Sequence, residues 1–140
     1  VSQNKIVVNY PANISITDSS VQAVAKRAVT RAIKRQAESV LPQILYQIAQ
    51  KYDYSYTSVS VKNMRSRWGS CSSQGVIALN IWLVQLPEKL QTYVLCHELA
   101  HLNHPNHQRE FWQELATMVP NYTQLRNELK AYQPSISFTP

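Results

Sequence analysis

The residues best suited to chemistry in this sequence are its four histidines, which all fall within the stretch 94–107. His97, Glu98 and His101 form the pattern H-E-x-x-H. On a helix, residues four apart lie about 40° apart in azimuth and one turn apart along the axis. The two imidazoles can therefore converge on one metal ion, while Glu98 projects beside them toward a metal-bound water. The pattern predicts a metal site on a helix.

A third ligand must come from outside this pattern, because catalytic zinc usually takes three protein ligands and keeps a fourth position for water or substrate. Asn103 and Pro105 indicate the end of the helix, since Asn is common just past a C-terminus and proline cannot donate the next backbone bond. His104 and His107 both compete for the third position. We favour His107, because it has the full turn in which to reverse direction, whereas His104 is expected to point past the metal.

Composition and length indicate one globular domain. A chain of 140 residues with 44% hydrophobic and 16% charged residues can bury a single modest core. No apolar run approaches the roughly 18 residues needed to span a bilayer, and no signal peptide is visible. Cys71 and Cys96 are expected to be free thiols in a reducing compartment, which predicts a cytoplasmic protein with no membrane partner. Cys96 directly precedes His97 and is expected to be buried.

The positive charge of the chain suits an anionic partner. The net charge is +6 and the sequence pI about 9.5. One predicted helical segment holds five basic residues with no acidic residue until Glu38; they are Lys26, Arg27, Arg31, Lys34 and Arg35. This basic face at 26–35 either tracks phosphates or is the solvated side of an amphipathic helix. The second interpretation is favoured because no aromatic residue interleaves with it, so nucleic acid is a possible but not a favoured partner.

The N-terminal part of the chain is predicted to be mostly helical. Residues 5–10 resemble a short strand, and Asp18 or Ser19 can cap a long helix. Pro42 is expected to open a second helix that runs to about Lys51.

Two strands and three helices are expected in the rest of the chain. Residues 54–64 and 76–80 predict strands that pair as a hairpin. Pro87 is expected to open the metal-binding helix, and helices are expected before Pro120 and over 122–132. The predicted fold is α+β, with a small antiparallel or mixed sheet packed against the HExxH helix. We expect one domain over 1–140, with a helical part at about 18–52 and a metal-site core at about 57–133.

Several motifs occur together in one order and spacing. They are Arg67-Trp68-Gly69-Ser70-Cys71, Ile77-Ala78-Leu79-Asn80, His97-Glu98-Leu99-Ala100-His101-Leu102, Asn106-His107 and Phe111-Trp112. Over roughly residues 59–132 the sequence resembles the YgjP-like metallopeptidase family, which is related to the SprT-like and WLM zinc proteins. This resemblance implies a small zincin-like fold. It also implies that His97, His101 and His107 bind one zinc ion and that Glu98 is the catalytic residue.

The predicted function is a zinc-dependent hydrolase, in the first place a metallopeptidase with Glu98 as general base toward a zinc-activated water. A peptide or protein is the expected substrate, and strand 76–80 is the candidate sheet edge for pairing with it. Arg67, Asn80 and Tyr122 have side chains suited to stabilising an oxyanion, and the sequence does not choose among them.

Two alternative functions remain open. The first is a metal-dependent hydrolase of an anionic non-peptide substrate, such as a nucleotide phosphoanhydride, which would suit the net charge of +6. The second is a nucleic-acid-associated, SprT-like protease or binding module, whose affinity should fall steeply with salt. The substrate, the physiological metal and the oligomeric state are not readable from the sequence.

Overall fold

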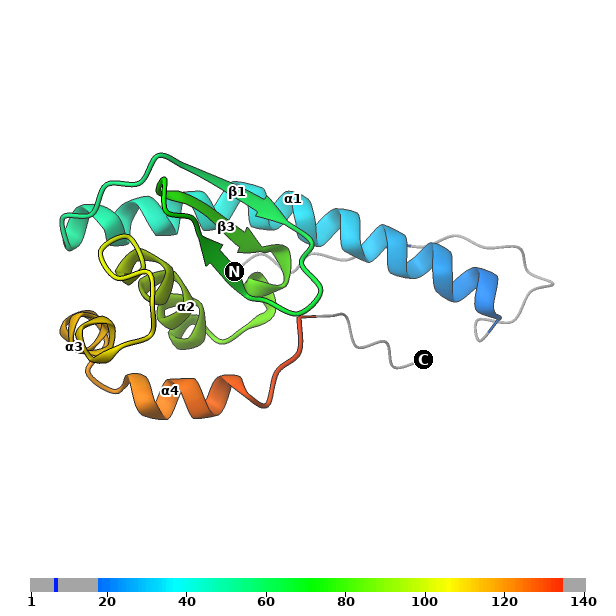
Figure 1. The fold of residues 1–140 in the computed structure, drawn as a ribbon. Coiled ribbons are helices and arrows are strands. Elements are labelled where there is room, and N and C mark those ends of the chain that lie inside the picture. Colours follow the sequence, from blue (N-terminus) through cyan, green and yellow to red (C-terminus); the bar gives the residue numbers. More distant parts are fainter. Residues whose placement is uncertain (1–6, 8–17, 135–140) are drawn as a thin grey trace.

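The computed structural model describes Val7 and residues 18–134, and this part of the chain folds as helices around a small mixed sheet (Figure 1). The elements in chain order are α1 (Ser19–Lys51), β1 (Ser58–Lys62), β2 (Gly69–Cys71), β3 (Val76–Asn80), the 3-10 helix η1 (Ile81–Gln85), α2 (Glu88–Ala100), α3 (Arg109–Met118) and α4 (Tyr122–Leu129). The predicted α+β class is therefore confirmed. No helix in the described residues is long and apolar enough to cross a membrane. The strand predicted at 5–10 lies outside the described residues, apart from Val7.

Helix α1 is one continuous helix, so the prediction of a new helix at Pro42 is wrong. Asp18 caps it by accepting the backbone N–H of Ser20 at 2.8 Å. A proline inside a helix removes one intrahelical hydrogen bond. Leu41 and Leu45, on either side of Pro42, are fully buried in the core. Burial of this face offsets the lost bond, and tertiary packing overrides the local signal.

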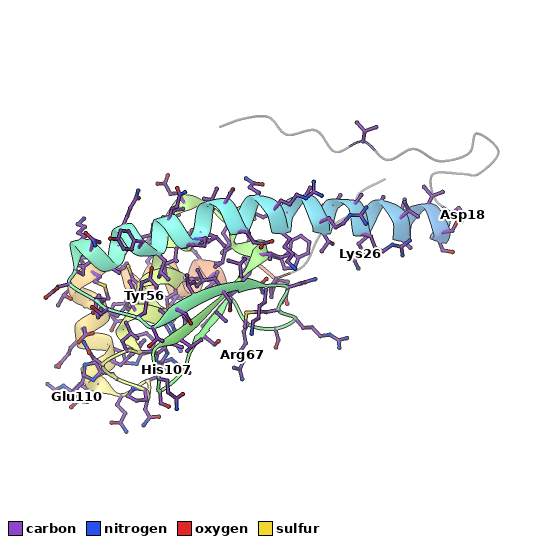
Figure 2. The ribbon with its side chains drawn as sticks, turned by 90° about the horizontal axis from the view of Figure 1, so that it is seen from above. Asp18, Lys26, Tyr56, Arg67, His107 and Glu110 are labelled. Atoms are coloured by element: carbon purple, nitrogen blue, oxygen red, sulfur yellow. The ribbon has the colours of Figure 1, made fainter. Side chains whose placement is uncertain are left out.

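The N-terminal half of α1 extends beyond the sheet, and Lys26 lies on this extension (Figures 1 and 2). All five basic side chains of the 26–35 face are exposed. Exposure is expected of both interpretations of this face, so the favoured one, a solvated face, stays a prediction. The C-terminal half of α1 instead packs against β1 and η1.

The sheet has the order β1-β3-β2, with β1 parallel and β2 antiparallel to β3. The predicted hairpin between 54–64 and 76–80 is therefore wrong, and the hairpin is formed by β2 and β3 instead. Its turn is built by Ser72, whose Oγ accepts the N–H of Gln74 and of Val76, and by Gly75 at φ +77°. Because β3 is the central strand, it cannot be the free edge that we expected it to be.

Helix α2 is the element on which the others converge. It contacts β2 on one side and packs against α1, α3 and α4 on the others. Its buried residues Leu90, Val94, Leu95 and Leu99 join one core with side chains from α1, β3 and α3. The predicted packing of the sheet against the HExxH helix is thus confirmed.

Candidate metal centre

Three histidine rings gather at the C-terminal end of α2. The ring nitrogens Nε2 of His101 and His107 are 3.0 Å apart, and ligand atoms of His97, His101 and His107 all lie within 4.8 Å of one another. Three nitrogens bound to one tetrahedral zinc ion at about 2.0–2.1 Å would lie roughly 3.4 Å apart. The cluster is close to that spacing, so these three side chains could hold a metal ion.

The turn after α2 fixes one of these rings in the orientation that a ligand needs. His101 is the C-cap of α2, and its Nδ1 lies 3.0 Å from the backbone carbonyl oxygen of His104. A carbonyl oxygen only accepts, so Nδ1 carries the proton and donates it. In the neutral ring, Nε2 then presents a lone pair on the side that faces His107. A hydrogen bond of this kind is the usual outer support of a metal-binding histidine.

Helix α3 supplies an aromatic floor beneath the cluster. The ring of Phe111 is fully buried, and its centroid lies 5.0, 4.5 and 4.9 Å from the rings of His97, His101 and His107 respectively. Burial lowers the pKa of His107, and the neighbouring His97 and His101 lower it further. A lowered pKa favours the neutral imidazole, which is the form that binds metals.

Glu98 lies beside the histidines in a space that only a glycine leaves open. The residue is 5% exposed, and its Oε2 is 3.3 Å from Nδ1 of His97. A Cβ atom on Gly69 would meet Cγ of Glu98 at 3.0 Å and its Oε2 at 3.2 Å. The carbonyl of Ala78, also 3.2 Å away, closes the other side. This contact is a physical reason for the glycine in the Arg67–Cys71 motif.

A cleft of about 490 Å³ opens directly in front of Glu98. Helix α2 forms one wall with Tyr93, Val94 and His97, the segment 66–69 before and at β2 forms a second, and α4 with the residues after it forms a third. Arg126 of α4 lies in this third wall, with its guanidinium 5.0 Å above the ring of Trp112.

Sequence reasoning missed Tyr93 and Arg126. Tyr93 occupies the helical position one turn before His97, which was the available signal for it. Arg126 lies on α4, and nothing in the sequence of that helix indicates that Arg126 faces the site.

The three residues expected to stabilise an oxyanion do not line the cleft. Asn80 is fully buried, where it caps η1 through the N–H of Trp82 and donates from Nδ2 to the carbonyls of Met64 and Arg67. Its side-chain amide therefore holds the loop before β2 in place and is not available to a substrate. Tyr122 stacks on Trp112 at 5.3 Å, and Arg67 is exposed outside the cleft, on the side of the sheet away from α1 in Figure 2.

His104 has a different partner from the other three histidines. Its Nε2 is 3.2 Å from Oε1 of Glu114 on α3, and Nδ2 of Asn103 donates to the same carboxylate at 3.0 Å. The hydroxyl of Tyr54, just after α1, donates to Glu114 at 2.6 Å. Burial and this hydrogen bond raise the pKa of Tyr54. We call these residues (Tyr54, Asn103, His104 and Glu114) the Glu114 network; it ties the turn before His107 to α3 and to the end of α1.

Comparison with solved structures finds two similar folds. The metallopeptidase zymogen of Pyrococcus abyssi abylysin aligns with a TM-score of 0.59 and 22% identity, over 66% of this chain and 93% of that one. The metallopeptidase zymogen of Methanocaldococcus jannaschii jannalysin aligns with a TM-score of 0.56 and 22% identity, over 64% and 93%. At this level of identity the likeness shows a shared fold.

Comparison at the sequence level gives the family. None of the curated proteins compared matches the chain. The family model described as a YgjP-like metallopeptidase domain matches residues 3–132, which is nearly the whole chain. This match agrees with the resemblance seen in the motifs, and it includes the three histidines that gather at the end of α2. The chain therefore belongs to the YgjP-like metallopeptidase domain family.

Proposed function

We propose that this protein is a zinc-dependent metallopeptidase of the HExxH type, with His97, His101 and His107 holding one zinc ion and Glu98 as the general base. The observation that carries the proposal is the gathering of three imidazoles beside a carboxylate that lines an open cleft. Membership of a metallopeptidase family supports it. When bound, zinc supplies a Lewis acid that polarises a carbonyl and lowers the pKa of water to about 7.

The residues of the chain divide the remaining work. His101, held by the carbonyl of His104, presents its Nε2 toward the same point as His107. Glu98 lines the cleft with its Oε2 3.3 Å from Nδ1 of His97, so it takes the proton of the attacking water and passes it to the leaving amine. Gly69 leaves the room in which the Glu98 side chain can do so.

The free edge of the sheet next to the cleft belongs to β2, which replaces 76–80 as the edge that could bind substrate. Strand β2 is paired with β3 on one side, and Gly69 at its start lines the cleft together with Trp68. An extended peptide lying along this edge would gain main-chain hydrogen bonds and pass in front of Glu98. A peptide substrate is therefore preferred over the non-peptide alternative.

The proposal is tested by metal analysis and a hydrolysis screen. We expect one zinc ion per chain and hydrolysis of peptides, but not of nucleotides tested in parallel. The Glu98→Gln variant should keep the metal, because Glu98 is not a ligand, and lose at least about 10²-fold in kcat, as expected for a general base. Loss of zinc from this variant would show that Glu98 helps to hold the metal and that its assignment as a general base alone is wrong. Cleavage of nucleotides with no cleavage of peptides would favour the alternative hydrolase.

Three further expectations stay predictions. They are the single domain over 1–140, the cytoplasmic location, and nucleic acid as an unfavoured partner.

A further inference from the structure

The cleft beside Glu98 carries positive charge that the proposed hydrolytic residues do not use. Apart from Glu98, the Asp, Glu, Lys and Arg side chains that line it are Arg126 and Lys130. They are four residues apart, at the end of α4 and at its C-cap, so they face the same side of that helix. Neither forms an ion pair with a carboxylate anywhere in residues 18–134.

Arg126 is held at the cleft wall by aromatic packing. Its guanidinium lies over Trp112, which is itself stacked on Tyr122 with an angle of 18° between the ring planes. A cation–π contact uses the flat face of the guanidinium and leaves the N–H donors at its edge free. Arg126 lines the same cleft as His97 and Glu98, which places it next to the proposed metal centre.

The surroundings of the two cations suit a group with an apolar stem and a charged end. Trp68, Leu129 and Tyr132 line the same cleft and supply apolar surface beside them. A guanidinium with free edge donors matches the two oxygens of a carboxylate in geometry, and this is the strongest kind of hydrogen bond that it makes. A side chain such as that of glutamate has both required parts.

We propose that Arg126, assisted by Lys130, is a specificity-determining site that binds a carboxylate of the peptide substrate close to the scissile bond. The inference rests on the proposed metallopeptidase function and adds the substrate class, which is peptides with a carboxylate close to the cleaved bond. The carboxylate comes either from an Asp or Glu side chain or from a free C-terminus, since both present the same planar pair of oxygens.

The test uses matched peptides that differ only in charge next to the cleaved bond. The zinc-loaded protein should cleave a Glu peptide with a kcat/KM about tenfold or more above that of its Gln twin. The Arg126→Gln variant should lose this preference, so that its ratio of kcat/KM for the Glu peptide over the Gln peptide falls to about one. Arg126→Lys should keep part of the preference for the Glu peptide, because the positive charge remains but the paired N–H donors of the guanidinium do not. Arg126→Glu should instead prefer a Lys peptide. Pairs with free and amidated C-termini distinguish the two sources of the carboxylate.

Two controls separate a failure of this inference from a failure of the proposed function. Arg31→Gln removes one exposed positive charge on α1, far along the chain from the cleft, and should leave the preference unchanged. Equal cleavage within the Glu/Gln pair and also within the free/amidated pair by the zinc-loaded protein would overturn the carboxylate site and leave the peptidase intact. If no peptide is cleaved, binding of the same pairs to zinc-loaded Glu98→Gln, followed by tryptophan fluorescence, still decides. Tighter binding of the Glu peptide or of the free C-terminus that disappears with Arg126→Gln supports the site, and equal binding within both pairs refutes it.

Discussion

Two groups of polar side chains, the Glu114 network and the cluster of His97, His101 and His107, flank the turn between α2 and α3. They differ in whether their polar atoms already have partners within the chain. In the Glu114 network the carboxylate is fully occupied, since it accepts from Tyr54, Asn103 and His104. In the histidine cluster, the Nε2 atoms of His101 and His107 lie 3.0 Å apart, and a ligand atom of His97 lies within 4.8 Å of both. An arrangement that is complete without a further atom indicates a structural role. Ring nitrogens of three side chains that converge on one point indicate a binding role.

The sharpest test of this comparison replaces each of the two histidines of the turn, His107 and His104, by alanine in separate variants. His107→Ala should weaken zinc binding by more than about 100-fold, since changes in supporting residues alone cost 10- to 100-fold. His104→Ala should weaken it by roughly tenfold or less, because the backbone carbonyl that holds His101 remains. Competition with a chelator of known affinity measures both. If His104→Ala lost more zinc affinity than His107→Ala, His104 would be the ligand and His107 the structural residue.

A second test removes the centre of the Glu114 network. Glu114→Ala leaves three donors without their acceptor, so the free energy of unfolding of the metal-free protein should fall by about 2–3 kcal/mol. Glu114→Gln keeps an accepting oxygen and serves as the matched control, with a smaller loss. Chemical denaturation without metal gives both values. A variant with full stability but greatly reduced zinc affinity would show that this network is itself part of the metal site.

A third test separates Glu98 from the imidazoles within the binding group. In Gly69→Ala the new methyl group meets Glu98 at about 3.0–3.2 Å, which displaces the carboxylate by a few tenths of an ångström. We expect kcat to fall by roughly tenfold, since catalysis depends steeply on placement, while zinc affinity stays within about twofold. Steady-state kinetics and zinc competition on one preparation give both numbers. Equal losses in the two would show that Gly69 supports the whole site.

The smallest effect is expected at the two cysteines. Burial raises the pKa of the Cys96 thiol to about 12, and the side chain is 1% exposed. Its thiol should therefore react with a disulfide reagent at pH 8 only as fast as the protein unfolds. Cys71 on β2 is half-buried and should react first. Time courses with and without denaturant measure the difference, and comparable rates would mean that the inner face of α2 is more open than its packing suggests.

The parts of this site that could be predicted from sequence are those set by local geometry. His97 and His101 converge because helical spacing places them one turn apart, and His107 follows in the turn that begins where α2 ends at Ala100, just before Asn103 and Pro105. The structure brings His107 to the other two rings, and its preference over His104 as a ligand stays a prediction.

The parts that could not be predicted depend on contacts between distant segments. Tyr54 and Glu114 are 60 positions apart, and nothing near either residue indicates the pair. The parallel pairing of β1 with β3 requires the chain to cross over, which the alternating pattern cannot distinguish from a hairpin. Pro42 was misread for the same reason, because the burial that keeps α1 intact comes from the core and not from its neighbours in sequence.

Helix α1 has a consequence for anyone who wishes to dissect this protein. Four of its side chains, Ala37, Leu41, Leu45 and Ala49, belong to the same buried cluster as Leu99 and Phe111 beneath the histidines. Tyr54, just past its end, reaches across to Glu114. A fragment that starts at β1 would expose the apolar side chains that α1 covers and would leave Glu114 with one donor fewer. The part of the chain that holds the histidines therefore cannot be produced as a stable fragment without α1.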